Sequence, residues 1–213
     1  MTTFTQTNNY TSPSAALALR IANSCLLTLI VLINLYTIGI PLRPSISFWF
    51  GQHFGSVASS LSNIVNNPEI TPSQVFEPDE IIGGKRLIIP SLLLDKPIYE
   101  GNSPGIVHKG VWRLPHTSTP DAGSNTVFVG HRFSYKDPAV FYNLDKMEKG
   151  QRFAVFWNQH KYLYEVMSKD VVAPTRIDIE APTTESRLTL YTCTPLWTAK
   201  NRLVVVAKLV EKT

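Results

Sequence analysis

The sequence has little cysteine, with only Cys25 and Cys193 in 213 residues. A small domain held by disulfides would need more cysteine, and a structural zinc site would need more clustered Cys and His side chains than one thiol offers. No internal repeat or low-complexity segment is visible, which excludes repeat architectures. The chain has 44% hydrophobic and 17% charged residues, so it has the composition of a globular protein.

The sequence also lacks a basic stripe. Its net charge is +4, but Arg20 and Arg43 account for two of the 20 Lys and Arg residues, and all 16 acidic residues lie downstream of them. The portion from residue 44 onward is therefore only +2, with mixed signs. This balance excludes the class of nucleic-acid-binding proteins.

One long apolar run without any charged side chain covers residues 21–42. About 20 such residues cross a ~30 Å hydrocarbon core, and the segment LLTLIVLI is apolar on every face, unlike a surface helix. The alternatives are a buried core helix and a cleaved secretory signal, but the run is long for a signal and no small-x-small pair follows closely. We therefore predict a transmembrane signal anchor over residues 20–42, with the positive-inside count tied between its two ends.

Three further regions are predicted. Residues 1–19 are polar and uncharged and read as a disordered tail, and residues 43–83 read as a juxtamembrane amphipathic helix followed by a Pro-rich linker. That helix, within residues 47–67, either lies on the membrane or packs on the domain. From residue 84 to 213, short strand-like runs alternate with turn residues, which predicts a mainly antiparallel barrel or sandwich with one helical patch near 138–147 and a hairpin turn at 158–160.

Cys193 ends the run RLTLYTC and is the thiol for which a functional role is expected. Cys25 lies within the apolar run as a small filler and cannot pair with it. An exported domain rarely keeps an unpaired thiol that has no task, because such thiols oxidise. Together with the absence of a second span, this places the folded domain outside the cell, on a single-pass membrane protein.

Two other residues offer matching chemistry. His131 ends the strand-like run NTVFVGH and can transfer protons near neutral pH. Arg202 opens the run NRLVVVAKLV, and the loop 195–201 can fold back to bring it beside Cys193, where a guanidinium can stabilise an oxyanion. The four remaining histidines are predicted to be structural or merely exposed: His53, His108, His116 and His160.

These segments resemble the sortase family. TLYTC at 189–193 resembles the TLxTC signature of the family, VGHR at 129–132 its histidine segment, and NRLVV at 201–205 its arginine strand. With further likeness in RLIIPSLLLDKPIYEG and GSNTVFVGHR, the resemblance covers about residues 84–210. A phosphatase loop or an L,D-transpeptidase motif fits the cysteine less well.

The resemblance implies a closed eight-stranded β-barrel, preceded here by the transmembrane helix. It implies a cysteine transpeptidase that cleaves an LPxTG-like sorting signal of secreted surface proteins through a thioacyl enzyme. The acyl group passes to an amine, such as a peptidoglycan precursor or another envelope protein. Cys193 is then the nucleophile, His131 its partner and Arg202 the oxyanion stabiliser. By analogy with the motif, Tyr191, Thr192 and Thr194 are substrate-binding candidates.

Two departures bear on the subclass. The sequence shows no convincing lid motif before the barrel and no C-terminal span, which argues against pilin polymerisation. Some relatives bind calcium before the catalytic strand, where this chain has Asp178, Glu180 and Glu185, but loop acids of this kind are mostly solvated, so we predict no metal and no cofactor. The alternative function is a catalytically inactive, membrane-tethered β-barrel that binds peptides.

Overall fold

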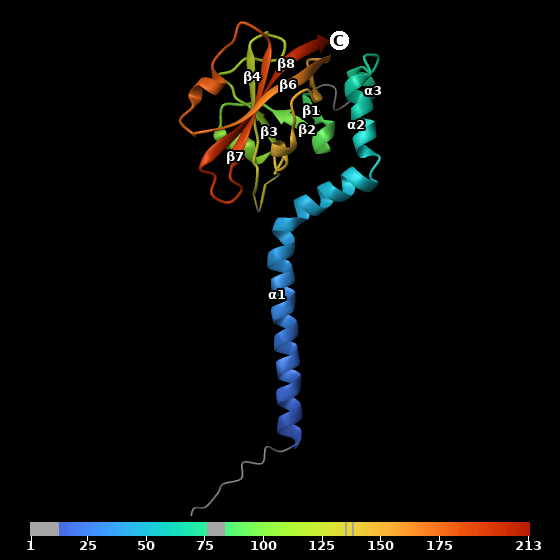
Figure 1. Ribbon diagram of the computed structural model, residues 1–213, viewed down its shortest axis with the longest axis vertical. Helices are drawn as coiled ribbons and strands as arrows, with labels where there is room; N and C mark the ends of the chain where they lie inside the picture. Colours follow the sequence, from blue (N-terminus) through green and yellow to red (C-terminus); the bar gives the residue numbers. More distant parts are fainter. Residues whose placement is uncertain (1–12, 76–83, 135, 138) are drawn as a thin grey trace, which may run out of the picture. The chain divides into compact units, whose positions relative to one another are not determined.

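The computed structural model describes residues 13–75, 84–134, 136–137 and 139–213 (Figure 1). The chain divides into two compact units, Met1–Ser47 and Phe48–Thr213. Helix α1 (Pro13–Phe54) runs through the boundary between them. Part of the predicted linker, residues 76–83, and most of the predicted tail, residues 1–12, lie outside the described residues.

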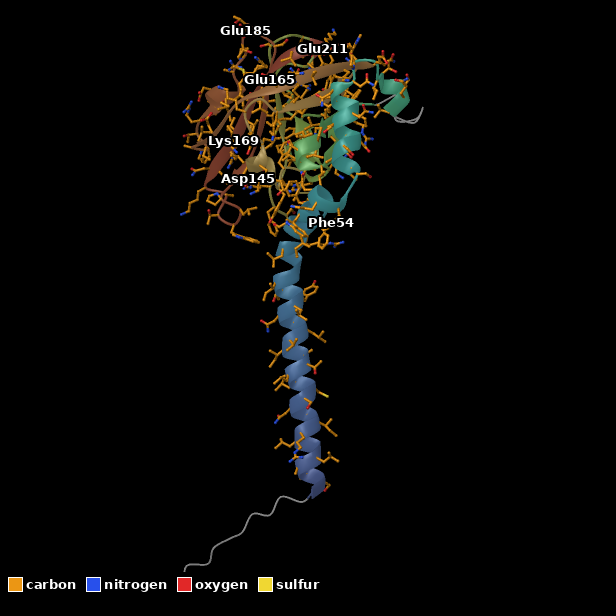
Figure 2. All side chains as sticks on the ribbon, turned by 45° about the vertical axis from the view of Figure 1, so that its right-hand side comes forward. Phe54, Asp145, Glu165, Lys169, Glu185 and Glu211 are labelled. Carbon is orange, nitrogen blue, oxygen red and sulfur yellow. The ribbon has the colours of Figure 1, made fainter. Side chains whose placement is uncertain are left out.

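The first unit contains the apolar part of α1. Residues 14–39 form a helix long and apolar enough to cross a membrane, and none of it is buried inside the protein. Figure 2 shows side chains projecting from this helix on all sides. Thr28 and Asn34 donate to the carbonyls of Ser24 and Ile30 one turn earlier, at 2.9 and 2.8 Å, so these polar groups are satisfied within the helix. The helix begins at Pro13, upstream of the start predicted from the sequence.

The second unit is built around a closed barrel of eight strands, as predicted, in the order β1-β2-β3-β4-β7-β8-β6-β5. Neighbours are antiparallel except for the pairs β2/β3 and β4/β7, which are parallel. The strands are β1 (Arg86–Ile89), β2 (Leu94–Tyr99), β3 (Val111–Arg113), β4 (Asn125–Val129), β5 (Arg152–Trp157), β6 (His160–Val172), β7 (Arg187–Thr194) and β8 (Asn201–Lys212).

Alternating apolar side chains fill the interior of the barrel. On β7, Leu188 and Leu190 point into the same core cluster as Phe128 of β4 and Val205 of β8. This period of two fixes which side chains of each strand face inward. The registers of β4, β7 and β8 are therefore set by the core, and the ends of these strands carry the predicted site residues.

The hairpin β5–β6 confirms the predicted turn with one refinement. Asn158 and Gln159 have φ of 48° and 65°, and Trp157 pairs directly with His160. Two consecutive residues with positive φ make the tight turn whose twist matches that of the flanking strands. His160 is thus the first residue of β6 rather than part of the turn.

The segment 47–67, predicted as one helix, is divided between the end of α1 and helix α2 (Val57–Asn66), and α2 packs on the barrel. Its Leu61 and Val65 are buried in a second apolar cluster with Phe156 and other barrel residues. The ammonium of Lys161, a residue only 3% exposed, donates to the carbonyls of Ile64 and Asn67 at 2.9 and 2.6 Å. These bonds satisfy carbonyl groups that a helix end leaves without partners.

The remaining helices are short. Helix α3 (Pro72–Val75) follows α2, and four 3-10 helices lie in the loops: η1 (Pro90–Leu92), η2 (Pro104–His108), η3 (Leu144–Lys146) and η4 (Ile177–Glu180). The helical patch predicted near 138–147 is wrong, because within its described residues, 139–147, η3 is the only helix. Turns precede η3 in this segment, and its apolar residues are nevertheless buried in the barrel core: Phe141, Leu144 and Met147.

Candidate active site

Cys193 and Arg202 are cross-strand partners. The antiparallel pairing of β7 with β8 ends with Cys193 opposite Arg202 and Thr194 opposite Asn201. Directly opposed residues have Cα atoms about 4.5 to 5.5 Å apart, so both side chains belong to one end of the barrel. The guanidinium of Arg202 donates to the carbonyls of Ala199 and Asn201 at 3.3 and 3.2 Å, which ties it to the connecting loop.

His131 lies two residues beyond the last parallel pair of β4 and β7, Val129 with Tyr191. Continuing that register places His131 beside Cys193. The continuation is supported by the hydroxyl of Thr192, which donates to the carbonyl of Gly130 at 2.8 Å. Thr192 is 1% exposed, and its hydroxyl joins the two strand ends. Its role in substrate binding stays a prediction.

Gly130 permits Val140 and Phe141 to pack closely against the end of β4. A Cβ at this position would lie 2.9 Å from Cδ2 of Phe141 and closer still to Val140. Any side chain would therefore push the strand end away from the segment that packs against it. The backbone of that segment is bonded to the histidine, since the amide of Phe141 donates to the His131 carbonyl at 3.0 Å.

The imidazole of His131 is one-quarter exposed and faces two polar groups that the sequence did not predict there. Its Nε2 lies 3.2 Å from Nδ1 of His108 and 3.9 Å from Oδ2 of Asp137. Burial lowers the pKa of His131, the His108 ring lowers it further, and Asp137 opposes both. The site thus favours the neutral imidazole more than water does.

His108 is exposed, as predicted, but it is not isolated. It ends η2, and its Nδ1 lies 2.9 Å from Oδ2 of Asp137. Asp137 could have been suspected, because it follows His131 by six residues in the same loop. Nothing in the sequence around His108 indicates a position so close to His131.

Arg132 is a second residue that sequence reasoning missed. Its side chain is 10% exposed, and its NH1 donates to the hydroxyl of Thr194 at 2.7 Å. Its NH2 lies 3.1 Å from Oδ1 of Asp145 on η3, which is labelled in Figure 2. Arg132 therefore bridges the His131 segment to the residue after Cys193, and the predicted substrate contact Thr194 is held by it.

Tyr191, the third substrate-binding candidate, connects the catalytic strand to the β6–β7 loop. Its hydroxyl donates to Oε1 of Glu180 at 2.8 Å, and Oε2 of Glu180 lies 2.7 Å from Nε2 of His116. Burial and the bond to Glu180 raise the pKa of Tyr191. Asp178 instead forms two hydrogen bonds of 2.7 Å with Arg176, so these two acids are directed to different protein partners.

An aromatic pair joins the two loops that leave the site. Phe133, after His131, and Trp197, after Cys193, have ring centroids 4.6 Å apart in an edge-on arrangement. Trp197 is 62% exposed. Apolar surface is therefore exposed on the loop that follows Cys193.

A cysteine, a histidine and an arginine at one end of a closed barrel fit the class of cysteine acyl-transfer enzymes, and comparison with known proteins gives the family. The family model of the sortase domain matches residues 87–210. The chain therefore belongs to the sortase family, whose members are cysteine transpeptidases.

Individual relatives agree with this assignment. Sortase SrtE1 of Streptomyces coelicolor is 30% identical to this chain over 173 residues, which cover 73% of this chain and 47% of that protein. Sortase A of Bacillus anthracis is 25% identical over 131 residues, which cover 62% of this chain and 60% of that protein. The crystal structure of Sortase E1 from Streptomyces coelicolor with a tripeptide in the active site has a TM-score of 0.54 at 28% identity, covering 60% of this chain and 88% of that one. The chain thus spans about half of the first of these curated relatives and three-fifths of the second.

Proposed function

We propose that this chain is a membrane-tethered transpeptidase that cleaves an LPxTG-like sorting signal of surface proteins and transfers the acyl group to an amine of the cell envelope. The single observation that carries the proposal is the pairing of Cys193 with Arg202 across β7 and β8, with His131 at the end of the adjoining strand β4. The apolar helix of residues 14–39 would anchor the enzyme as a single-pass protein, with the barrel outside the cell.

The first half-reaction forms a thioester. The Cys193 thiolate attacks the carbonyl carbon of the scissile peptide bond, and the electron pair of that carbonyl moves to its oxygen. The Arg202 guanidinium would donate hydrogen bonds to this oxyanion. When the tetrahedral intermediate collapses, the C–N bond breaks and protonated His131 gives its proton to the departing amine.

The second half-reaction forms a new amide. An incoming amine, from a peptidoglycan precursor or another envelope protein, attacks the thioester and loses a proton to His131 while Cys193 leaves as thiolate. Because the thioester keeps the acyl-transfer free energy of the original amide, no nucleotide is consumed. The hydrogen-bond donors at this end of the barrel and the exposed Trp197 fit a peptide substrate. No nucleic-acid partner is proposed.

A peptide library tests the proposal. The full-length chain in mild detergent is mixed with peptides varied around a sorting motif and with a panel of amines, and intact-mass spectrometry follows the protein and the products. We expect a protein mass increased by the acyl fragment and a peptide joined to the amine. Binding of peptides without any adduct or joined product would support the inactive binding barrel instead.

The Arg202→Ala variant should lower kcat/KM by about 100-fold or more, because one oxyanion donor typically contributes that much. Arg202→Lys should recover only part of the loss, since an ammonium lacks the planar fork of donors. Steady-state transpeptidation measures both variants. Arg187→Ala, at the opposite end of β7, is the matched control. Wild-type rates in Arg202→Ala would remove this residue from the mechanism.

A further inference from the structure

Three metal-ligating atoms converge at the His131 side of the site. They are Nδ1 of His108, Nε2 of His131 and Oδ2 of Asp137, and each lies within 4.8 Å of the others. Their separations are 2.9 Å from His108 to Asp137, 3.2 Å between the two imidazoles and 3.9 Å from His131 to Asp137. The ligands come from two segments distant in sequence, η2 and the loop after β4.

The tautomers of the two imidazoles decide which of their nitrogens carry a hydrogen. In the tautomers that leave Nδ1 of His108 and Nε2 of His131 unprotonated, both nitrogens present a lone pair to the cluster, and the ionised carboxylate of Asp137 only accepts hydrogen bonds. A cation at the centre would bind all three acceptor atoms at once.

We propose that His108, His131 and Asp137 form a zinc-binding site and that zinc bound there inhibits the transpeptidase. Zinc binds histidine nitrogen at about 2.0 to 2.1 Å and carboxylate oxygen at about 2.0 to 2.2 Å, in tetrahedral geometry, which separates two ligand atoms by roughly 3.3 Å. The three observed separations bracket that value. Three protein ligands leave a fourth position open to water or substrate.

The ligand set selects the kind of ion. Two imidazoles and one carboxylate suit zinc and its neighbours among the transition metals, whereas calcium and magnesium prefer oxygen ligands alone. A second contact orients the carboxylate, because the hydroxyl of Ser134 donates to Oδ2 of Asp137 at 3.0 Å. The site is distinct from the loop acids Asp178 and Glu180, which bind Arg176 and Tyr191.

Inhibition rests on the proposed function. When zinc binds Nε2 of His131, the electron pair of that nitrogen can no longer bind a proton. His131 then cannot supply the proton that the departing amine needs. Zinc therefore removes the acid without altering the barrel, and a chelator restores it. The sulfur of Cys193 is not required for binding.

Calorimetry tests the site without using activity. The full-length chain, purified in mild detergent with a histidine-free tag and stripped with chelator, is titrated with zinc chloride. We expect one equivalent of zinc in the wild type and in Cys193→Ala, and an affinity lowered at least about tenfold in His108→Ala and in Asp137→Asn. His160→Ala, which removes an exposed histidine elsewhere, is the control. Circular dichroism confirms that each variant is folded.

Two results would overturn the site: unchanged zinc affinity in His108→Ala, or loss of binding in Cys193→Ala with retention in His108→Ala. The latter would assign the zinc to the thiol. Calcium at the same concentrations should give no comparable heat.

Activity then tests the inhibition separately. The ratio of transpeptidation rates with and without stoichiometric zinc should fall at least tenfold in the wild type and return with chelator. In His108→Ala the ratio should stay near one, whatever the absolute rate. A ratio that falls equally in both variants would contradict inhibition through this site. If no variant shows transpeptidation, the proposed function fails while the calorimetric result still decides the zinc site.

Discussion

We expect the Cys193→Ala variant to form no thioacyl adduct and to lose transpeptidation by at least about 10⁴-fold, down to the background rate. The thiolate is the only group in the proposed mechanism that becomes covalently bound to the acyl fragment, so neither His131 nor Arg202 can replace it. Intact-mass spectrometry after mixing with a sorting peptide detects the adduct, and chromatography of the joined product measures the rate. The change removes a single sulfur from a half-buried strand end and leaves the core of the barrel untouched.

The matched control is Cys25→Ala. Cys25 is the other free thiol and lies on α1, in the other unit of the chain, so its loss should leave adduct formation and turnover at wild-type levels. A labelled peptide that still attaches to Cys193→Ala, or a product that still accumulates, would show that another nucleophile operates. Peptide affinity retained in Cys193→Ala would separate a loss of chemistry from a loss of binding.

The pairing of Cys193 with Arg202 is the part of the site that local sequence predicts well. Only residues 194–200 separate the two strand-like runs, so an antiparallel return was the simplest connection, and the structure has it. The closed barrel was harder to predict from the sequence. Alternation predicts a half-buried sheet but does not distinguish a barrel from a sandwich, and that choice rested on the resemblance.

The contacts around His131 could not be predicted from the residues alone. Its position depends on a parallel pairing of β4 with β7, which are separated by β5 and β6 in the sequence and by no strand in the barrel. His108 lies on η2, in the connection between β2 and β3, and the pairing of β3 with β4, with Trp112 opposite Val129, brings this connection to the His131 end of β4. Such pairings leave no periodic signal in either strand.

The same reasoning explains why Arg132 and Lys161 were missed. Both are cations that the sequence pattern places at strand ends, where solvent exposure is the usual outcome. In the structure both are largely buried and bind polar groups of distant segments, Thr194 and the carbonyl of Ile64 among them. Arg132 and Thr192 hold the His131 segment and the Cys193 segment together from two sides, so the geometry of the site depends on residues that need not touch the substrate.

The His131→Ala variant should lower kcat/KM by about 10² to 10⁴-fold, the contribution typical of a positioned general acid. The loss should be smaller than that of Cys193→Ala, because the thiol keeps some nucleophilic character at higher pH without an imidazole partner. Transpeptidation rates measured with chelator present, so that no metal competes for the ring, check the size of the effect. His160→Ala, an exposed histidine at the start of β6, should be unaffected.

The environment of His131 makes a further prediction about pH. Burial and the neighbouring His108 ring hold the pKa of His131 below its ordinary value of 6.5, so protonation of the ring requires more acidic solution than in a free imidazole. His108→Ala removes the second cause and also opens the ring to water, and both changes raise the pKa of His131. One of the two apparent pKa values in the profile of kcat/KM against pH should therefore move upward in His108→Ala, in chelator. NMR titration of the His131 ring protons, assigned by their absence in His131→Ala, should show the same upward movement, and a downward shift would contradict the contribution of His108. His131 is the proton donor of the mechanism, and its pKa moves in His108→Ala. The transpeptidation rate near neutral pH should therefore change in this variant, although His108 does not contact the substrate in this mechanism.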